Sequence, residues 1–142
     1  MHCVNACPEN AIEIDMRSYV YLQTGMAKTV KVVLETFEPD RVFYITMLTN
    51  ITPLCDCWGF STPALVPDVG IVAGGDIVAV EKAALDLIDA ENYIPGTLPD
   101  QMKMGGEGHL FKQIWGVDPY VQVGASERLR LGDGRYRLAG VD

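Results

Sequence analysis

The chain has few basic residues and no long apolar run, and each scarcity excludes a class of function. Lysine and arginine number 11 against 19 acidic residues, which gives a net charge of -8. Nucleic acids and anionic membrane surfaces attract basic patches, so neither is an expected partner. No apolar run reaches the ~18 residues of a membrane span, and no basic stretch precedes an apolar core as in a signal peptide. We therefore expect a cytoplasmic protein.

Cysteine is also scarce, and its placement is informative. The 142 residues include four cysteines, which fall in two pairs, Cys3 with Cys7 and Cys55 with Cys57. In a reducing compartment, paired cysteines serve metal binding or redox chemistry more often than disulfides. Each pair is therefore a candidate metal or redox site.

The first pair has the spacing of the second half of a ferredoxin motif. Bacterial-type clusters are held by a C-x2-C-x2-C-x3-C-P run, and CVNACP at residues 3–8 matches its end. The two missing cysteines would precede Met1, so we expect Met1 to be an internal methionine of a longer parent. Residues 1–16 would then be a truncated ferredoxin-like remnant, with Cys3 on one 4Fe-4S cluster and Cys7 on the other. The alternative is a chance pair of cysteines before a helix.

Residues 17–142 are expected to form a C-terminal α/β domain. Apolar positions three and four apart predict an amphipathic helix over 17–37. Segments 41–49 and 69–73 are almost continuously apolar, which predicts strands buried on both faces, as in a parallel sheet. Further helices are expected over 77–90, 109–115 and 120–131, and a last strand over 135–141. The predicted fold is therefore α/β, with a partly parallel sheet and flanking helices.

The second cysteine pair lies in the loop that follows the first predicted strand. Functional residues of open α/β sheets gather at the carboxyl ends of strands, and Cys55 and Cys57 can offer two thiolates to one metal. Asp56 between them, or Asp68 at the entrance to the next strand, would add an oxygen ligand. The alternatives are two small buried side chains in a turn and a strained disulfide.

Other polar residues have simpler roles. Asp76 is placed as the N-cap of the next helix. Glu81 and Asp86 are five positions apart on that helix and point about 140° from each other, so they do not form one site. The glycine-rich residues 105–108 before His109 lack the Lys-Ser/Thr of a phosphate-binding loop. Nucleotide binding is therefore not expected there.

Three longer segments resemble the C-terminal part of the domain of unknown function 362 family. They are LTNITPLCDCWGF at 48–60, ALVPDVGIVAGGDIVAVEKAALDLID at 64–89 and QVGASERLRLGDGRYRLAGVD at 122–142. Members of that family commonly carry a pair of inserted ferredoxin-like cluster motifs ahead of such a block. The resemblance implies iron–sulfur binding in a longer parent, and it implies no established reaction.

Two functions of different classes follow as expectations. The first is a 4Fe-4S protein that transfers electrons to a partner redox protein through Cys3 and Cys7. The second is a metal-dependent enzyme or metallochaperone with Zn²⁺ or another metal at Cys55 and Cys57. A third arrangement would join all four cysteines in one tetrahedral site that holds Zn²⁺ or a cluster. Because a remnant without its other half exposes apolar surface, we also expect the chain to self-associate.

Overall fold

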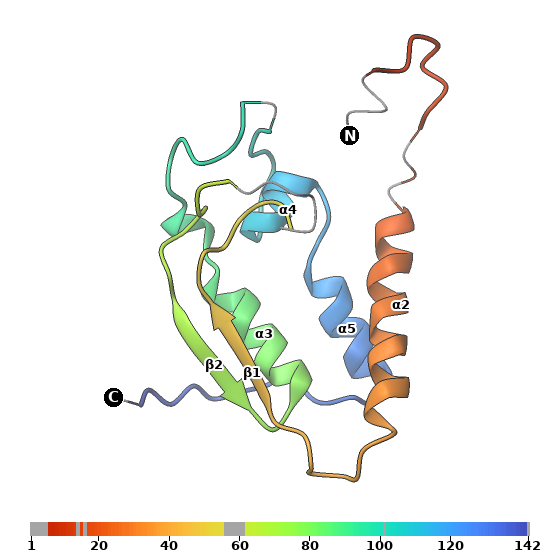
Figure 1. Ribbon diagram of the computed structural model, residues 1–142, viewed down its shortest axis with the longest axis vertical. Helices are drawn as coiled ribbons and strands as arrows, with labels where there is room; N and C mark the ends of the chain where they lie inside the picture. The colour runs from red at the N-terminus through yellow and green to blue at the C-terminus, as the bar shows by residue number, and fades with distance from the viewer. Residues whose placement is uncertain (1–5, 14, 16, 56–61, 101, 142) are drawn as a thin grey trace.

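The computed structural model describes residues 6–13, 15, 17–55, 62–100 and 102–141 (Figure 1). The elements are α2 (Arg17–Leu34), β1 (Tyr44–Leu48), β2 (Gly70–Gly74), α3 (Ile77–Leu87), a 3₁₀ turn η2 (Ala90–Asn92), α4 (Leu110–Trp115) and α5 (Tyr120–Arg128). The protein is therefore mixed α/β, as predicted. The helices and strands lie within the predicted segments, except for a shift of one residue at the end of β2.

The sheet has two strands among the described residues, and they are antiparallel. The prediction of a partly parallel sheet is therefore wrong for this part of the chain. The reason is the way the connecting loop returns. The Val69 N–H donates to the Leu48 carbonyl at 2.9 Å, and the Asn50 N–H donates to Asp68 Oδ1 at 2.8 Å. These bonds hold the start of β2 beside the end of β1, so β2 must run back.

Only one face of this sheet is buried, which also corrects the prediction of strands covered on both sides. On the inner face Leu48 and Val72 are buried and Tyr44 packs against the same core. On the outer face the apolar side chains alternate with these and are exposed. The run in β1 is apolar on both faces, yet only one of these faces is covered. The apolar character of a strand therefore does not by itself show that both faces are buried.

α3 lies against the inner face of the sheet and forms the centre of the core. Asp76 caps it as predicted, since its Oδ1 accepts the Val78 N–H at 2.8 Å and the Ala79 N–H at 3.1 Å. Leu65, Val66 and Leu110 close the core from the loop and from α4. The buried cluster comprises Leu48, Leu65, Val66, Val72, Val80, Ala83, Ala84, Ile88 and Leu110.

α5 packs against α3, and α2 packs along α5 as the outermost layer (Figure 1). Two polar contacts fix α2. The Gln23 amide donates to the Asp118 carbonyl at 3.2 Å, and the Lys31 ammonium donates to the Leu129 carbonyl at 3.0 Å. Ala27 is the fully buried residue of α2. The helix is therefore held along one side, and its other side carries exposed apolar residues.

The predicted strand over 135–141 is wrong, since that segment is irregular. It is anchored by single hydrogen bonds instead of a ladder. The Asp133 N–H donates to Asp76 Oδ2 at 2.9 Å, and the Gly134 N–H donates to Glu127 Oε1 at 3.0 Å. These bonds tie the residues just before the segment to the start of α3 and to α5, and the Tyr136 hydroxyl ties the segment itself to Asp86 of α3.

Candidate functional site

Cys7 lies in a tight turn that directs backbone N–H groups at its sulfur. The Ala11 N–H donates to Cys7 Sγ at 3.3 Å, and the Asn10 N–H donates to the Cys7 carbonyl at 3.2 Å. Pro8 fixes the entrance to the turn, and Asn10 has a positive φ of 48°. Donation by the Ala11 N–H, followed by that of Glu9, lowers the pKa of the Cys7 thiol. The turn therefore favours the thiolate, which is the form that binds metals.

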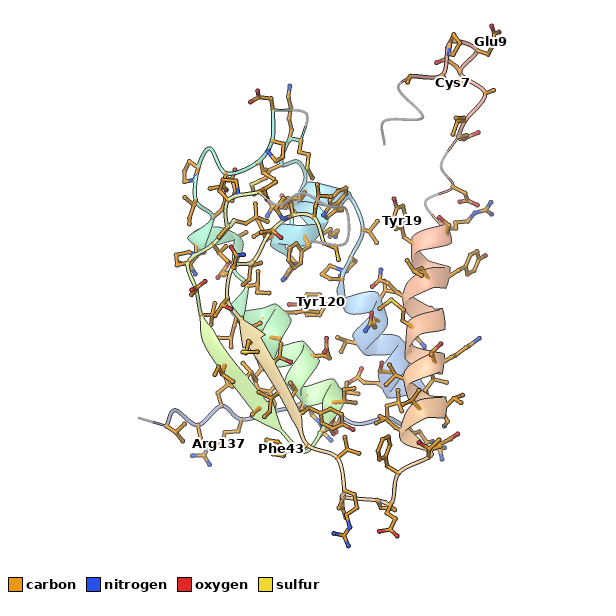
Figure 2. All side chains as sticks on the ribbon, in the orientation of Figure 1. Cys7, Glu9, Tyr19, Phe43, Tyr120 and Arg137 are labelled. Atoms are coloured by element: carbon orange, nitrogen blue, oxygen red, sulfur yellow. The ribbon has the colours of Figure 1, made fainter. Side chains whose placement is uncertain are left out.

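The segment that carries Cys7 extends away from the helices and the sheet. Figure 2 shows Cys7 and Glu9 beyond the first turn of α2, away from Tyr120 and Phe43 in the body of the molecule. Among the residues that the structure describes, the hydrogen bonds of this segment stay within residues 7–18. Cys7 is half-buried by its own turn, and its described neighbours are exposed. Cys7 therefore lies apart from the buried core of the body.

The other predicted ligands are placed less completely. Cys3, Asp56 and Cys57 lie outside the described residues. Cys55 is exposed in the loop between β1 and β2. Asp68 Oδ1 accepts the Asn50 N–H, as described above. This carboxylate therefore has a structural role in holding the connection between the strands.

The structure does not bring the described ligand candidates together. Cys7 lies beyond the N-terminal end of α2, whereas Cys55 and Asp68 belong to the connection between β1 and β2. Within the described ranges, no group of three or more His, Cys, Asp or Glu side chains is placed to hold a metal ion. The shared site of four cysteines, two of which are not described, stays a prediction.

A cavity of about 390 Å³ lies among α2, α3, α4 and α5. Its wall is mainly apolar and includes Tyr19, Phe111 and Trp115. The Trp115 indole N–H is already engaged, since it donates to the Pro53 carbonyl at 3.1 Å. Sequence reasoning missed this cavity, because its lining residues come from four elements far apart along the chain.

Glu81 is the acidic group of this cavity. Loss of hydration among the surrounding atoms raises the pKa of its carboxyl. Gln23, also in the wall, accepts the Gln122 N–H at 3.2 Å and is fixed by that bond. An apolar cavity whose described wall carries one carboxyl suits a small apolar molecule with one hydrogen-bonding group.

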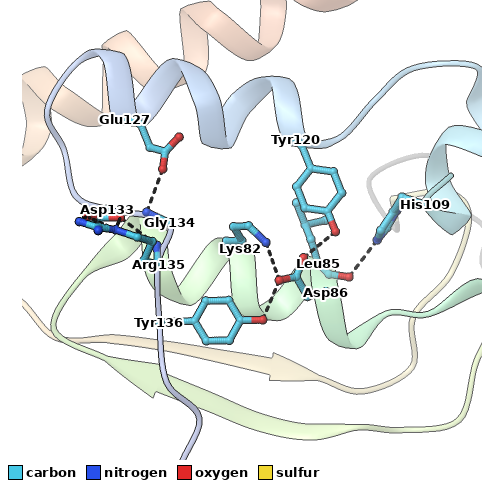
Figure 3. A network of polar contacts seen from close by, with 10 residues as sticks. All are labelled: Lys82, Leu85, Asp86, His109, Tyr120, Glu127, Asp133, Gly134, Arg135 and Tyr136. Carbon is cyan, nitrogen blue, oxygen red and sulfur yellow. Dashed lines mark hydrogen bonds and ion pairs between the residues drawn. The ribbon is translucent and has the colours of Figure 1, made fainter.

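Asp86 of α3 is the centre of a polar cluster with side chains of α5 and the C-terminal tail (Figure 3). Its Oδ1 accepts the Tyr120 hydroxyl at 2.7 Å, and its Oδ2 accepts the Tyr136 hydroxyl and the Lys82 ammonium, each at 2.6 Å. The Lys82 ammonium also lies 5.4 Å from the centre of the Tyr120 ring and 5.7 Å from that of Tyr136. The cluster therefore joins α3, α5 and the C-terminal tail.

The pKa values of this cluster follow from its bonds. Burial works to raise the pKa of Asp86, but hydrogen bonds from Lys82, Tyr136 and Tyr120 outweigh it and lower that pKa. Burial first, and then the bond to Asp86, raise the pKa of Tyr120. The bond to Asp86 first, and then burial, raise the pKa of Tyr136 to about 12. At neutral pH Tyr120 and Tyr136 therefore stay protonated and Asp86 stays ionised, which indicates a structural cluster more than a proton-transfer site.

His109 lies beside this cluster, with its ring edge-on to that of Tyr120. Its Nδ1 accepts the Phe111 N–H at 3.1 Å and so caps α4, while Nε2 lies 2.9 Å from the Leu85 carbonyl. Together the two contacts require a neutral ring with its proton on Nε2. The sequence offered one signal for the cluster, the four-residue spacing of Lys82 and Asp86 on a helix. Nothing in the sequence linked them to Tyr120 or Tyr136.

Comparisons with known proteins give one match. A family described as Domain of unknown function (DUF362) matches residues 1–86. The match covers the Cys7 turn, both strands and almost all of α3. A search of curated proteins found no match. A search of solved structures found none either. In the described part of the chain, no helix is both long enough and apolar enough to span a membrane.

Proposed function

The chain belongs to the DUF362 family, and from that premise we propose that it is a 4Fe-4S cluster-binding protein that passes electrons to a partner redox protein. Cys3 and Cys7 are the proposed cluster ligands. Cytoplasmic conditions, in which thiols stay reduced, suit this role. The family match does not itself name a cofactor, so the proposal depends on the chemistry of the cysteine segment.

The observation that carries the proposal is the bond from the Ala11 N–H to Cys7 Sγ. Iron–sulfur clusters are anionic and bind thiolates, and hydrogen bonds to the sulfurs stabilise that negative charge. The turn at residues 7–11 supplies such a bond and lowers the pKa of the thiol. The same segment carries the C-x3-C-P spacing of a ferredoxin half. Geometry and spacing therefore favour the same ligand.

The position of Cys7 also suits electron transfer. Its segment extends from α2 away from the body, so a partner protein can approach a cluster held there (Figure 2). A bound cluster accepts an electron from a donor and gives it to an acceptor, with no bond made or broken in this chain. The chain has an excess of acidic residues and a net charge of -8, which favours a basic partner.

The test is anaerobic reconstitution of the chain with iron, sulfide and a small thiol that completes the coordination. We expect the wild-type chain to retain iron and sulfide and to show a reducible cluster spectrum. Cys7→Ser should lose most of both, while the matched variant Cys55→Ser should keep them. A Cys7→Ser variant that retains as much iron and sulfide as the wild type would overturn the proposal.

The second candidate is a metal-dependent enzyme or metallochaperone that uses the loop at residues 55–57. The exposed position of Cys55 in the loop between β1 and β2 favours it, because such loops are accessible to ligands. Under this alternative Zn²⁺ or another metal binds to Cys55 and Cys57, with Asp56 or Asp68 as a further ligand. It predicts the opposite result: Cys55→Ser loses the metal and Cys7→Ser retains it.

A further inference from the structure

The outer face of the sheet is a bare apolar surface. Phe43, Ile45, Met47 and Ile71 are 66%, 65%, 71% and 67% exposed. Met47 lies opposite Ile71 in the register, and Ile45 lies opposite Ala73, so these side chains gather on the side away from α3. Phe43 lies just before the start of β1 in Figure 2. We propose that this outer face binds the same face of a second copy of the chain, related by a two-fold axis.

The absence of charge on this surface favours a second copy as the occupant. Residues 42–48 and 69–75 contain no charged side chain. Two chains that each carry a net charge of -8 repel each other, but the two strand segments of this face carry none of those charges. A basic or acidic partner would find nothing here to pair with, whereas an identical apolar face is complementary to it.

The exposed area of the chain is large enough for such an interface. A compact protein of 15.6 kDa exposes about 7,300 Å², but this chain exposes 10130 Å². The cysteine segment and the tail account for part of the excess. Four large side chains, each about two-thirds exposed, form a patch of several hundred Å². Two such patches, with their rims, approach the roughly 1,000 Å² of a specific interface.

The sheet itself gains from a second layer. Two antiparallel strands need a packing partner for stability, and among the described residues this two-stranded sheet has α3 on its inner face only. Packing two sheets face to face, at a separation of about 10 Å, is a common way to bury their apolar faces. The dimer would therefore be a small sandwich with α3 and its neighbours on each outer side.

The test is the mass of the full chain in solution, measured by sedimentation equilibrium over a wide range of concentration. We expect a monomer–dimer equilibrium in the wild type. Met47→Lys should weaken association by about a hundredfold or more, because each copy would bury an unpaired charge. The matched control is Leu22→Lys, which places the same charge on an exposed apolar residue of α2 (59% exposed) and should leave association unchanged.

Circular dichroism shows whether both variants keep the fold, which we expect because both positions face solvent in one chain. A wild-type chain that stays monomeric overturns the proposal and indicates that a different polypeptide covers this face. Dissociation by Leu22→Lys but not by Met47→Lys also overturns it, and places the contact on α2. Equal association of the wild type and both variants also overturns the proposal, because the sheet face would then not be the contact.

Discussion

The cysteine segment at residues 6–16 and the body that begins at α2 are built in opposite ways. Apart from the half-buried Cys7, the described residues of the segment are exposed, and they are held by hydrogen bonds between near neighbours. The body has a continuous buried core and hydrogen bonds that join residues almost a hundred positions apart. The proposed chemistry lies in the first region and the stability in the second. Substitutions should therefore affect stability or iron content, and not both.

The largest effect is expected from Leu110→Ala in the core of the body. Leu110 is 0% exposed, so the truncation should lower the free energy of unfolding by about 3 kcal/mol. Urea unfolding followed by circular dichroism measures this change. The control Leu22→Ala removes the same atoms from a residue that is 59% exposed, and should change stability by less than about 0.5 kcal/mol. Reconstituted iron content should be unchanged in both folded variants.

A smaller effect is expected where the tail meets α3. A Cβ added at Gly132 would collide with the Asp76 carboxylate, which is held by three backbone N–H groups. Gly132→Ala should therefore lower the free energy of unfolding by about 1–3 kcal/mol. Gly140→Ala is the matched control, because a Cβ there meets no atom within 4 Å. Equal stability of the two variants would show that the Asp76 anchor is not tight.

A third prediction concerns the Asp86 cluster and alkaline pH. Tyr136→Phe removes one hydrogen bond to Asp86 and should cost about 0.5–1 kcal/mol at neutral pH, a reduced value because the ring is 38% exposed. The folded pKa of Tyr136 is raised to about 12, above its ordinary value of about 10. Its contribution is present below about pH 10 and is lost as pH rises toward 12.

The gap between Tyr136→Phe and the wild type should therefore narrow between about pH 10 and 12. Paired urea titrations at neutral and alkaline pH measure it. Tyr93→Phe is a suitable control, since that ring packs against the core outside the cluster. A gap that stays constant through the alkaline range would contradict the proposed bond between Tyr136 and Asp86.

Local sequence patterns predicted the helices of the body well. The apolar spacing before Leu34 and the cap at Asp76 are decided within a few residues, and both are confirmed. Non-local features were not predictable in this way. The run at 41–49 is apolar on both faces, yet only the return of the loop through Asp68 sets the strand direction, and nothing in the run shows that one face is bare.

In the candidate site, too, local features could be predicted from the sequence and non-local ones could not. The motif at Cys7 is local, so its spacing was visible, and its turn adds the bond from Ala11 that spacing alone could not show. The convergence of Tyr120 and Tyr136 on Asp86 spans 34 and 50 residues. It depends on how α5 and the tail pack on α3, which no short pattern contains. The predicted strand over 135–141 failed for the same reason.

The most direct test of this division is to compare the full chain with a chain of residues 17–142. Urea unfolding gives the stability of each, and anaerobic reconstitution gives the iron and sulfide content. We predict that the shorter chain unfolds with the same free energy, within about 0.5 kcal/mol, and binds no cluster. A shorter chain that is unfolded, or one that still holds iron and sulfide, would contradict the account.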